Sequence, residues 1–429
     1  MPDTNDPALR RAEGIAAFFQ IPRPVRAFHF EARGNMSHEM YLVRSGEGET
    51  ATEYLLQRMN NTVFTNPHGV VSAMRACTEA QRRYLRRNPM PAGRTWETVD
   101  LVPAAHNKWL LELIDDESVS FWRLMVRIPG CVCFKSLQEI PDRDQQLLIA
   151  EEAGRGLALF GDLTSGLDVR KIATPLPGYR DTRVYYAQLD CVMKGTRTYE
   201  DAEPFLPEDR TVRESTQFHF LVHLPPEEYG RRLSEPDLQE YIDLALENRE
   251  FALTLLRQRE RGRIRTVAIH GDTKLDNFLF DADTMRVRAL VDLDTIMPHT
   301  WLADWGDMAR SLVNIVGEKE PDLNRVQVDM EVFRALAKGF LGTAREVTDA
   351  EIELMPDAVQ ILALELGVRF LTDYLRGDSY FKLAPGDPPD LNKTRAMVQL
   401  TLFRRLVEKT QVMRECIAQC AEYRNTDQA

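Results

Sequence analysis

The sequence lacks three features that would place it in a specialised class of protein. It has no excess of positive charge, since 54 Lys and Arg stand against 66 Asp and Glu for a net charge of −12. Phosphate backbones demand a basic surface, so this charge excludes an extended nucleic-acid interface. No apolar run approaches the ~20 residues of a membrane span, and Met1–Asp6 lacks the basic-then-apolar order of a signal peptide. We therefore expect a cytoplasmic protein without a nucleic-acid or membrane partner.

Cysteine is also scarce. A chain of this size has no need of disulfide bonds for stability, and the cysteine spacing does not match the paired ligands of a zinc site. Cys416 and Cys420 have helical spacing, but no histidine pair accompanies them. His219 and His223 are spaced like metal ligands, yet no Glu follows His219 as zinc-protease chemistry requires. We expect reduced thiols at all six positions: Cys77, Cys131, Cys133, Cys191, Cys416 and Cys420.

What the sequence does contain is an ordered set of polar residues between positions 266 and 310. His270-Gly271-Asp272 follows the short apolar run 266–269, Asn277 comes five residues after Asp272, and Asp292 comes fifteen later. Two apolar runs, 278–280 and 287–291, flank turn residues at 281–284, which predicts a hairpin. Folding this hairpin back would bring Asn277 and Asp292 to one side of a cleft near Asp272.

These residue types suit phosphoryl transfer. A kinase holds a hydroxyl in line with the γ-phosphorus and neutralises the phosphate oxygens with Mg²⁺. Asp272 would accept the proton or orient the hydroxyl. Mg²⁺ prefers oxygen ligands and takes only one or two protein side chains besides phosphate and water. Asn277 and Asp292 would supply those two ligands.

Each acid also has a purely structural interpretation. A single Asp in a loop is most often a turn former, and Asp304 and Asp307 could cap a helix over 305–313. The ordered set as a whole favours a functional interpretation. Such a motif is confirmed by its structural context. A calcium loop beginning at Asp281 is excluded, because Met285 and Arg286 occupy positions that need an oxygen ligand and a glycine.

With these motifs the chain resembles the aminoglycoside phosphotransferase and choline kinase family, which has the protein-kinase-like fold. The resemblance implies that Asp272 is the catalytic base, that Asn277 and Asp292 bind Mg²⁺, and that His270 and Asp307 support the catalytic loop. Protein kinases themselves carry His-Arg-Asp and Asp-Phe-Gly, whereas this chain has His-Gly-Asp and Asp-Leu-Asp at 292–294. This difference favours a small-molecule substrate.

The resemblance also implies an α+β, bilobal architecture, with a small lobe containing an antiparallel sheet and a larger, mainly helical lobe. We expect an extension over 1–20, a nucleotide-binding lobe over 21–128, and a catalytic and substrate-binding lobe over 129–429. Strands are predicted at 25–30, 39–44, 52–58 and 121–128, with a helix at 67–87. Helical periodicity predicts further helices at 150–160, 237–260, 330–341, 358–376 and 393–423.

The ATP site would use the loop between the first two strands and the end of the third. That loop, 32–38, carries one glycine, so Gly34 would need help from the side chains of Asn35 and Ser37 in holding phosphate. The third strand ends in Gln57 and Arg58. An arginine can contact two phosphate oxygens at once. Strand alternation puts these two side chains on opposite faces, so only one of them can point into the cleft.

Further segments resemble a narrower branch, the N-acetylhexosamine 1-kinases. They are residues 54–64, 270–280, 292–298 and 369–381. By this resemblance Arg369 and Tyr380 are sugar contacts, and ATP phosphorylates an anomeric hydroxyl. Spacing alone favours a different role for Arg369, an ion pair with Glu365 or Asp373, each four residues away on the predicted helix.

Two alternatives remain open at this stage. The acceptor could be another hydroxyl compound, such as an aminoglycoside-like antibiotic or an amino alcohol. The chain could also be a catalytically silent binding protein on the kinase fold. The second is disfavoured because Asp272, Asn277 and Asp292 are all present.

Overall fold

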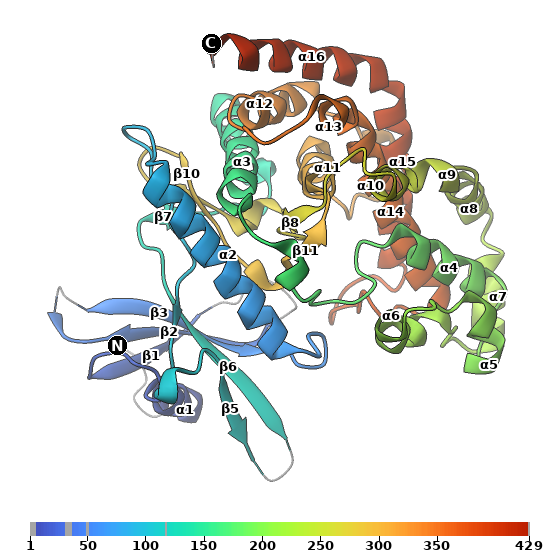
Figure 1. Cartoon of the computed structure of the whole chain (residues 1–429). Coiled ribbons are helices and arrows are strands. Elements are labelled where there is room, and N and C mark those ends of the chain that lie inside the picture. The colour runs from blue at the N-terminus through green and yellow to red at the C-terminus, as the bar shows by residue number, and fades with distance from the viewer. Residues whose placement is uncertain (1–5, 31–36, 49–50, 116–117, 428–429) are drawn as a thin grey trace.

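A six-stranded antiparallel sheet dominates the first third of the chain (Figure 1). The computed structural model describes residues 6–30, 37–48, 51–115 and 118–427. The strand order is β1-β2-β3-β6-β4, and β5 pairs with β6. The bounds are β1 Val25–His29, β2 Ser37–Ser45, β3 Thr52–Met59, β4 Leu101–Val102, β5 Leu111–Ile114 and β6 Val119–Val126.

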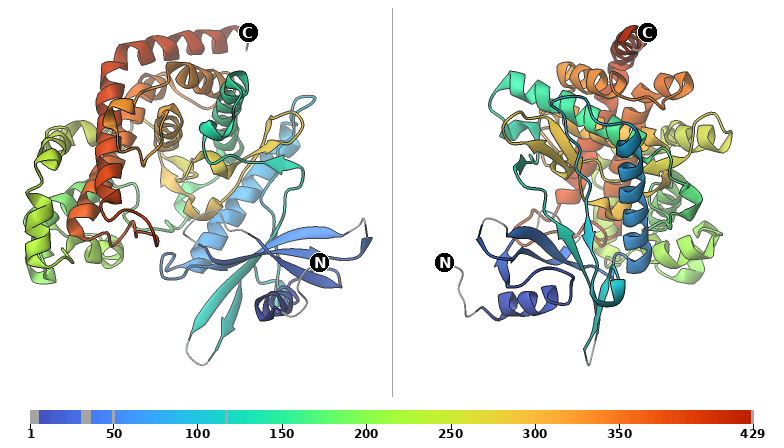
Figure 2. Two further views of the ribbon diagram at one scale, coloured as in Figure 1. Left: turned by 180° about the vertical axis from the view of Figure 1, so that it is seen from behind. Right: turned by 60° about the vertical axis from the view of Figure 1, so that its left-hand side comes forward.

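Alternation along these strands gives the sheet two different faces. Tyr54 and Leu56 of β3 face α1 (Pro7–Ala16), and they join Phe19 and Trp122 in one buried cluster. The opposite face packs against α2 (Pro67–Arg87), which lies between the sheet and the rest of the molecule (Figures 1 and 2). The face of β3 on which a side chain lies therefore decides whether it can take part in an active site between the lobes.

The remainder of the chain is mainly helical, which confirms the predicted α+β class and bilobal kinase-like architecture. Its largest buried cluster gathers around α14, which packs against α4, α11 and α15. The helices are α3 Arg143–Thr164, α4 Thr182–Met193, α5 Tyr199–Ala202, α6 Arg210–Thr216, α7 Pro226–Leu233, α8 Pro236–Glu247, α9 Arg249–Ala252, α10 Thr254–Glu260, α11 Trp301–Val313, α12 Met330–Leu341, α13 Asp349–Glu353, α14 Met355–Arg376, α15 Leu391–Glu408 and α16 Thr410–Asp427.

Two helices predicted as continuous are divided in the structure. The segment 237–260 forms α8, α9 and α10, and the first break lies at Asn248, whose side chain donates to the Leu244 carbonyl at 2.9 Å. The segment 393–423 divides at Lys409. There the Thr410 hydroxyl donates to the Val407 carbonyl, so a side chain satisfies a backbone group that helix continuation would have used. Helical periodicity survives such a break, so the sequence pattern does not reveal it.

Short strands at the base of the larger lobe position the predicted catalytic segment. β8 (Val267–Ile269) pairs with β11 (Met297–His299), and β9 (Phe278–Asp281) pairs with β10 (Val287–Leu290) and β7 (Cys131–Val132). The predicted hairpin is therefore confirmed. The predicted division at residues 128 and 129 falls between β6 and β7, and this boundary and the one at residue 20 stay predictions. Among the described residues, none of the helices has the length and apolar character of a membrane span.

Candidate active site

The segment that leaves β8 is held by Asp304, a buried residue of α11. One carboxylate oxygen of Asp304 accepts from the His270 N–H at 2.6 Å, and the other accepts from the Gly271 N–H at 2.8 Å. Gly271 has φ +84, and a Cβ there would lie 2.6 Å from the Thr295 carbonyl oxygen, so only glycine fits. The backbone before Asp272 is thus fixed from two sides.

Asp272 and Asn277 lie together, at the two ends of this loop. The Asn277 side-chain amide donates to the Asp272 carbonyl oxygen at 2.7 Å and to its carboxylate at 3.2 Å. The Lys274 ammonium lies 3.1 Å from the same carboxylate. The Asp272 side chain remains 30% exposed, so an incoming hydroxyl can reach it.

The β9–β10 hairpin carries Asp292 back to this loop. The His270 ring bonds the Val291 carbonyl at 2.7 Å, and the Val291 N–H donates to the Asn277 carbonyl at 2.9 Å. Asp292 itself has φ +63, a left-handed conformation that Asp tolerates better than most residues. Burial, together with the nearby charges of Asp294 and Asp272, raises the pKa of Asp292 to about 7. A bound cation would lower the pKa of Asp292 again, because it favours the ionised carboxylate.

Asp307 meets the catalytic loop through an arginine. Arg180 pairs with Asp307 and donates to the Gly271 carbonyl at 3.1 Å, while Arg310 pairs with Asp307 at 2.7 Å. Burial alone would raise the pKa of Asp307, but Arg180 and Arg310 hold it well below its usual range. The structure therefore places both predicted support residues, His270 and Asp307, around the loop that carries Asp272.

On the small-lobe side, Gln57 and Arg58 point in opposite directions, as strand alternation requires. Arg58 lies on the α1 face of the sheet and pairs with Glu39 at 2.8 Å, so it is not brought to the other predicted site residues. Gln57 lies on the opposite face and accepts from Arg123 of β6 at 2.8 Å. Gly34 and Asn35 lie outside the described residues, and of Ser37 only the backbone, at the start of β2, is described.

Arg123 links the sheet to the predicted metal-binding segment. Its guanidinium forms a two-pronged ion pair with the Asp294 carboxylate, one contact measuring 2.9 Å. Arg123 is only 2% exposed, so this pair is almost entirely removed from water. Glu79, an acid on the neighbouring helix α2, is exposed and pairs with Arg75 at 3.5 Å, so it is not the partner of Arg123. On the inner face of the sheet, Arg123 thus places a cation against the segment that carries Asp292.

Arg369 occupies a cage of aromatic rings. Its guanidinium carbon lies 4.8–5.4 Å from four ring centroids, those of Tyr179, Tyr185, Tyr380 and Phe381. Within the described residues it forms no ion pair, so the ion pair that spacing favoured is not formed. Asp373 instead pairs with Arg376 and accepts from the backbone N–H groups of Tyr380 at 3.0 Å and Phe381 at 2.8 Å. Arg369 and Tyr380, predicted as sugar contacts, are thus brought together.

The other candidates from the sequence lie apart from this arrangement or serve it indirectly. His223 stacks on Phe218, and the His219 ring meets the edge of Tyr380 at 5.2 Å. Within the described part of the chain no three His, Cys, Asp or Glu side chains gather as a metal site, and all six cysteines are free thiols.

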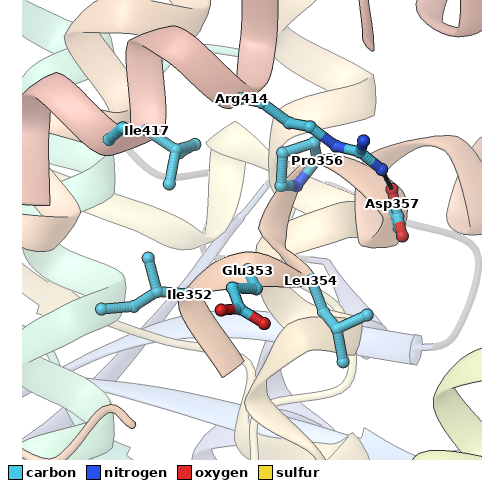
Figure 3. A pocket seen from close by; sticks show the side chains of 8 residues that line it. Ile352, Glu353, Leu354, Pro356, Asp357, Arg414 and Ile417 are labelled. Atoms are coloured by element: carbon cyan, nitrogen blue, oxygen red, sulfur yellow. Dashed lines mark hydrogen bonds and ion pairs between the residues drawn. The ribbon is translucent and has the colours of Figure 1, made fainter. Parts of the chain in front are cut away.

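A groove of about 490 Å³ lies between α16 and the start of α14, lined by Ile352, Leu354, Arg414 and Ile417 among others, on the part of the larger lobe far from the sheet (Figures 1 and 3).

Four residues around the site were missed or undervalued in the sequence. Lys274 is within the motif, two residues after Asp272 and two before Asp276, and its charge between these two acids was a readable signal. The sequence offers a helix cap as one role of Asp304 and does not show its bonds to the backbone of residues 270 and 271. Arg123 lies 149 residues before Asp272, on a segment with no motif, and no local signal identified it. Tyr179 lies 93 residues before Asp272 in the loop 178–181, whose polar, turn-rich composition indicates a border of the substrate pocket, although nothing in the sequence marked Tyr179 itself.

The fold and this loop define the class of protein, a phosphotransferase with the protein-kinase-like fold. Residues 30–324 match the model of the phosphotransferase enzyme family, APH, and the chain belongs to this family. It is therefore an enzyme that uses an alcohol group as phosphoryl acceptor, as predicted.

Two solved structures illustrate the shared fold. A microcompartment-associated aminopropanol kinase is 13% identical, with a TM-score of 0.53 over 94% of this chain and 98% of that chain. The amicoumacin kinase hAmiN, solved with AMP-PNP, Ca²⁺ and Ami, is also 13% identical, with a TM-score of 0.50 over 91% of this chain and 92% of that chain. At such identities the similarity shows the fold and does not identify the acceptor.

Proposed function

We propose that this protein is an ATP- and Mg²⁺-dependent kinase that phosphorylates a hydroxyl of a neutral sugar, specifically the anomeric hydroxyl of an N-acetylhexosamine. The observation that carries the kinase assignment is the convergence of Asp272, Asn277 and Asp292 on one loop pair. The nucleotide and metal are supported by the hAmiN structure, which contains AMP-PNP and Ca²⁺.

Asp272 would act on the acceptor hydroxyl. Its carboxylate is partly exposed and fixed by the Asn277 amide, so it can accept the proton as the oxygen attacks the γ-phosphorus. The bond that forms joins the sugar oxygen to phosphorus, and the bond that breaks releases ADP. Lys274, which lies 3.1 Å from Asp272, would neutralise charge on the transferred group.

The residues present fit a divalent cation. A carboxylate whose pKa is raised by burial and by neighbouring acids, together with an amide side chain on the adjoining loop, matches the hard oxygen ligands that Mg²⁺ prefers. Asp292 and Asn277 would hold the ion, which supplies charge neutralisation on the nucleotide phosphates. Two protein ligands suffice because Mg²⁺ in kinases completes its coordination with phosphate and water.

The surroundings of Arg369 favour a neutral acceptor over an amine. Cationic ligands are commonly held by aromatic cages or by acids, but here the cage already contains the Arg369 guanidinium. The nearby acids in the described chain are occupied as well: Glu365 accepts from Thr182 at 2.7 Å, and Asp307 and Asp373 pair with arginines. An acetamido carbonyl or a sugar hydroxyl can accept from a guanidinium, whereas an ammonium group would be repelled.

An N-acetylhexosamine and its deacetylated amine test this proposal directly, because they share one ring and differ in charge. We expect kcat/KM to favour the acetylated sugar by on the order of 100-fold, since juxtaposed like charges cost several kcal/mol. The substitution Arg369→Gln should narrow that ratio while leaving the KM for ATP unchanged. The measurement is ADP release with four acceptors: the two sugars, an amino alcohol and an aminoglycoside. Faster turnover of any of the amines would refute the neutral-sugar assignment.

The Arg123–Asp294 pair gives a second prediction. We expect Arg123→Gln to raise the KM for ATP by about tenfold, because the sheet loses its fixed position over the metal-binding segment. Breaking a buried pair also costs about 3–5 kcal/mol of stability, so the melting temperature must be measured first and the assay run below it. The matched comparison is Arg58→Gln, on the outer face of the same sheet, which should leave the KM unchanged. If Arg58→Gln raised the KM for ATP and Arg123→Gln left it unchanged, Arg58 and not Arg123 would support nucleotide binding.

A further inference from the structure

The segment Pro175–Arg180, which leads into α4, is attached to both lobes; we call it the strap. Leu176 packs against a cluster whose other members all come from residues 59–121 of the small lobe, so it is the one contribution from the larger lobe among the described residues of that cluster. In Figure 1 the connection into α4 passes beside the lower end of α2. The cluster's buried members are Met59, Phe64, Val70, Val71 and Leu110.

Three residues later the strap touches the catalytic loop. The Tyr179 hydroxyl donates to the Gly271 carbonyl at 2.9 Å, and Arg180 donates to the same oxygen at 3.1 Å. That carbonyl immediately precedes Asp272. The ring of Tyr179 also faces Arg369, whose guanidinium carbon lies 5.4 Å from the ring centroid. Tyr179 therefore stands between the proposed base and the proposed sugar-binding arginine.

The strap is also held along its length. Gly178 has φ +83, and a Cβ there would lie 2.9 Å from Thr216 and 3.0 Å from Val212, so the backbone rests closely on α6. Pro175 and Pro177 restrict the chain on either side of Leu176. A segment fixed at the small lobe, at α6 and at the catalytic loop has little freedom to move aside for a bulky ligand.

We propose that the strap is a specificity determinant that limits the acceptor to a single sugar ring, with Leu176 as the residue that holds it in place. The proposal rests on the proposed function, since it assumes an acceptor lying between Asp272 and Arg369. A ring in that position lies against Tyr179, and the strap continues from there to the small lobe. A second ring extending toward the small lobe would collide with Leu176 and its prolines.

A simpler role for the strap is a structural tie between the lobes. Such a tie would affect every substrate alike, including ATP, and would lower stability. A specificity role changes the ratio between a short and a long acceptor and leaves the KM for ATP unchanged. The measurement must therefore compare two acceptors that present the same reacting hydroxyl and differ only in length.

The experiment compares kcat/KM for an N-acetylhexosamine and for a disaccharide that carries the same sugar at its free reducing end. We expect the full-length wild-type enzyme to prefer the single ring by on the order of 100-fold, within the range that a pocket wall can supply, and Leu176→Ala to reduce this preference about tenfold. Val63→Ala, which trims the same cluster from the small-lobe side, is the matched control and should keep the wild-type ratio.

Each result decides the matter. An unchanged ratio in Leu176→Ala, or equal use of both acceptors by the wild type, overturns the proposal, as does a rise in the KM for ATP that accounts for the whole effect. Should Leu176→Ala fail to fold by thermal shift, Leu176→Val serves in its place with a smaller expected change in the same direction. If the wild type phosphorylates neither sugar but does phosphorylate another hydroxyl compound, the proposed function itself fails, and the ring limit fails with it.

Discussion

Replacing Asp272 with Asn is expected to reduce kcat by about 10²–10⁴-fold, the usual contribution of a positioned proton acceptor. Asn has nearly the same shape as Asp and keeps an oxygen that can accept from the Asn277 amide, so the loop should stay folded. What is lost is the basic carboxylate and its pairing with Lys274. Because Asp272 would act on the acceptor, ATP binding should be nearly unchanged.

Single-turnover kinetics and calorimetric titration with the nucleotide separate these two effects. Asp283→Asn is a matched control, since Asp283 is an exposed residue of the β9–β10 turn and the chemical change is the same. Near-normal turnover in the Asp272→Asn enzyme would mean that Asp272 is not the base.

Asp292→Asn should produce a different kind of loss. Removing the charged ligand is expected to raise the Mg²⁺ concentration for half-maximal activity by about 10–100-fold, the range seen when a group that supports a metal site is lost. Part of the turnover should return at saturating Mg²⁺, which would not happen for Asp272→Asn. Asn is the better substitution than Ala because residue 292 has φ +63, a conformation that Asn also tolerates.

Activity measured across a Mg²⁺ series, together with calorimetry of MgATP binding, checks this expectation. The same Asp283→Asn variant shows whether removing one negative charge from this region matters by itself. Wild-type Mg²⁺ dependence in Asp292→Asn would remove Asp292 from the metal site and would leave the proposed two-ligand arrangement without its charged member.

The local parts of the site were predictable because they are encoded in short segments. The strand before His270, the β9–β10 hairpin and α2 all appear at or near their predicted residues, since each depends on periodicity and turn residues over a few positions. The hairpin prediction also required that Asn277 and Asp292 meet, and the Val291 to Asn277 hydrogen bond joins their strands as expected.

The long-range contacts were not predictable in the same way. Whether Gln57 or Arg58 faces the larger lobe depended on which face of the sheet α1 covers, and the sequence around residue 58 does not indicate this. Arg369 had acids four residues away on both sides, so local spacing favoured an ion pair. Asp373 instead binds the backbone of the following loop, and this places aromatic rings around Arg369.

The sequence by itself determined the order and spacing of the proposed base, the two proposed metal ligands and their proposed supports, because a catalytic loop and a hairpin are short-range structures. Only the tertiary structure decided that Arg123 pairs with Asp294, what surrounds Arg369, and that residues 175–180 join both lobes beside the catalytic loop. Those features depend on packing between segments far apart in the chain, where burial and the pairing of charges outweigh any local preference.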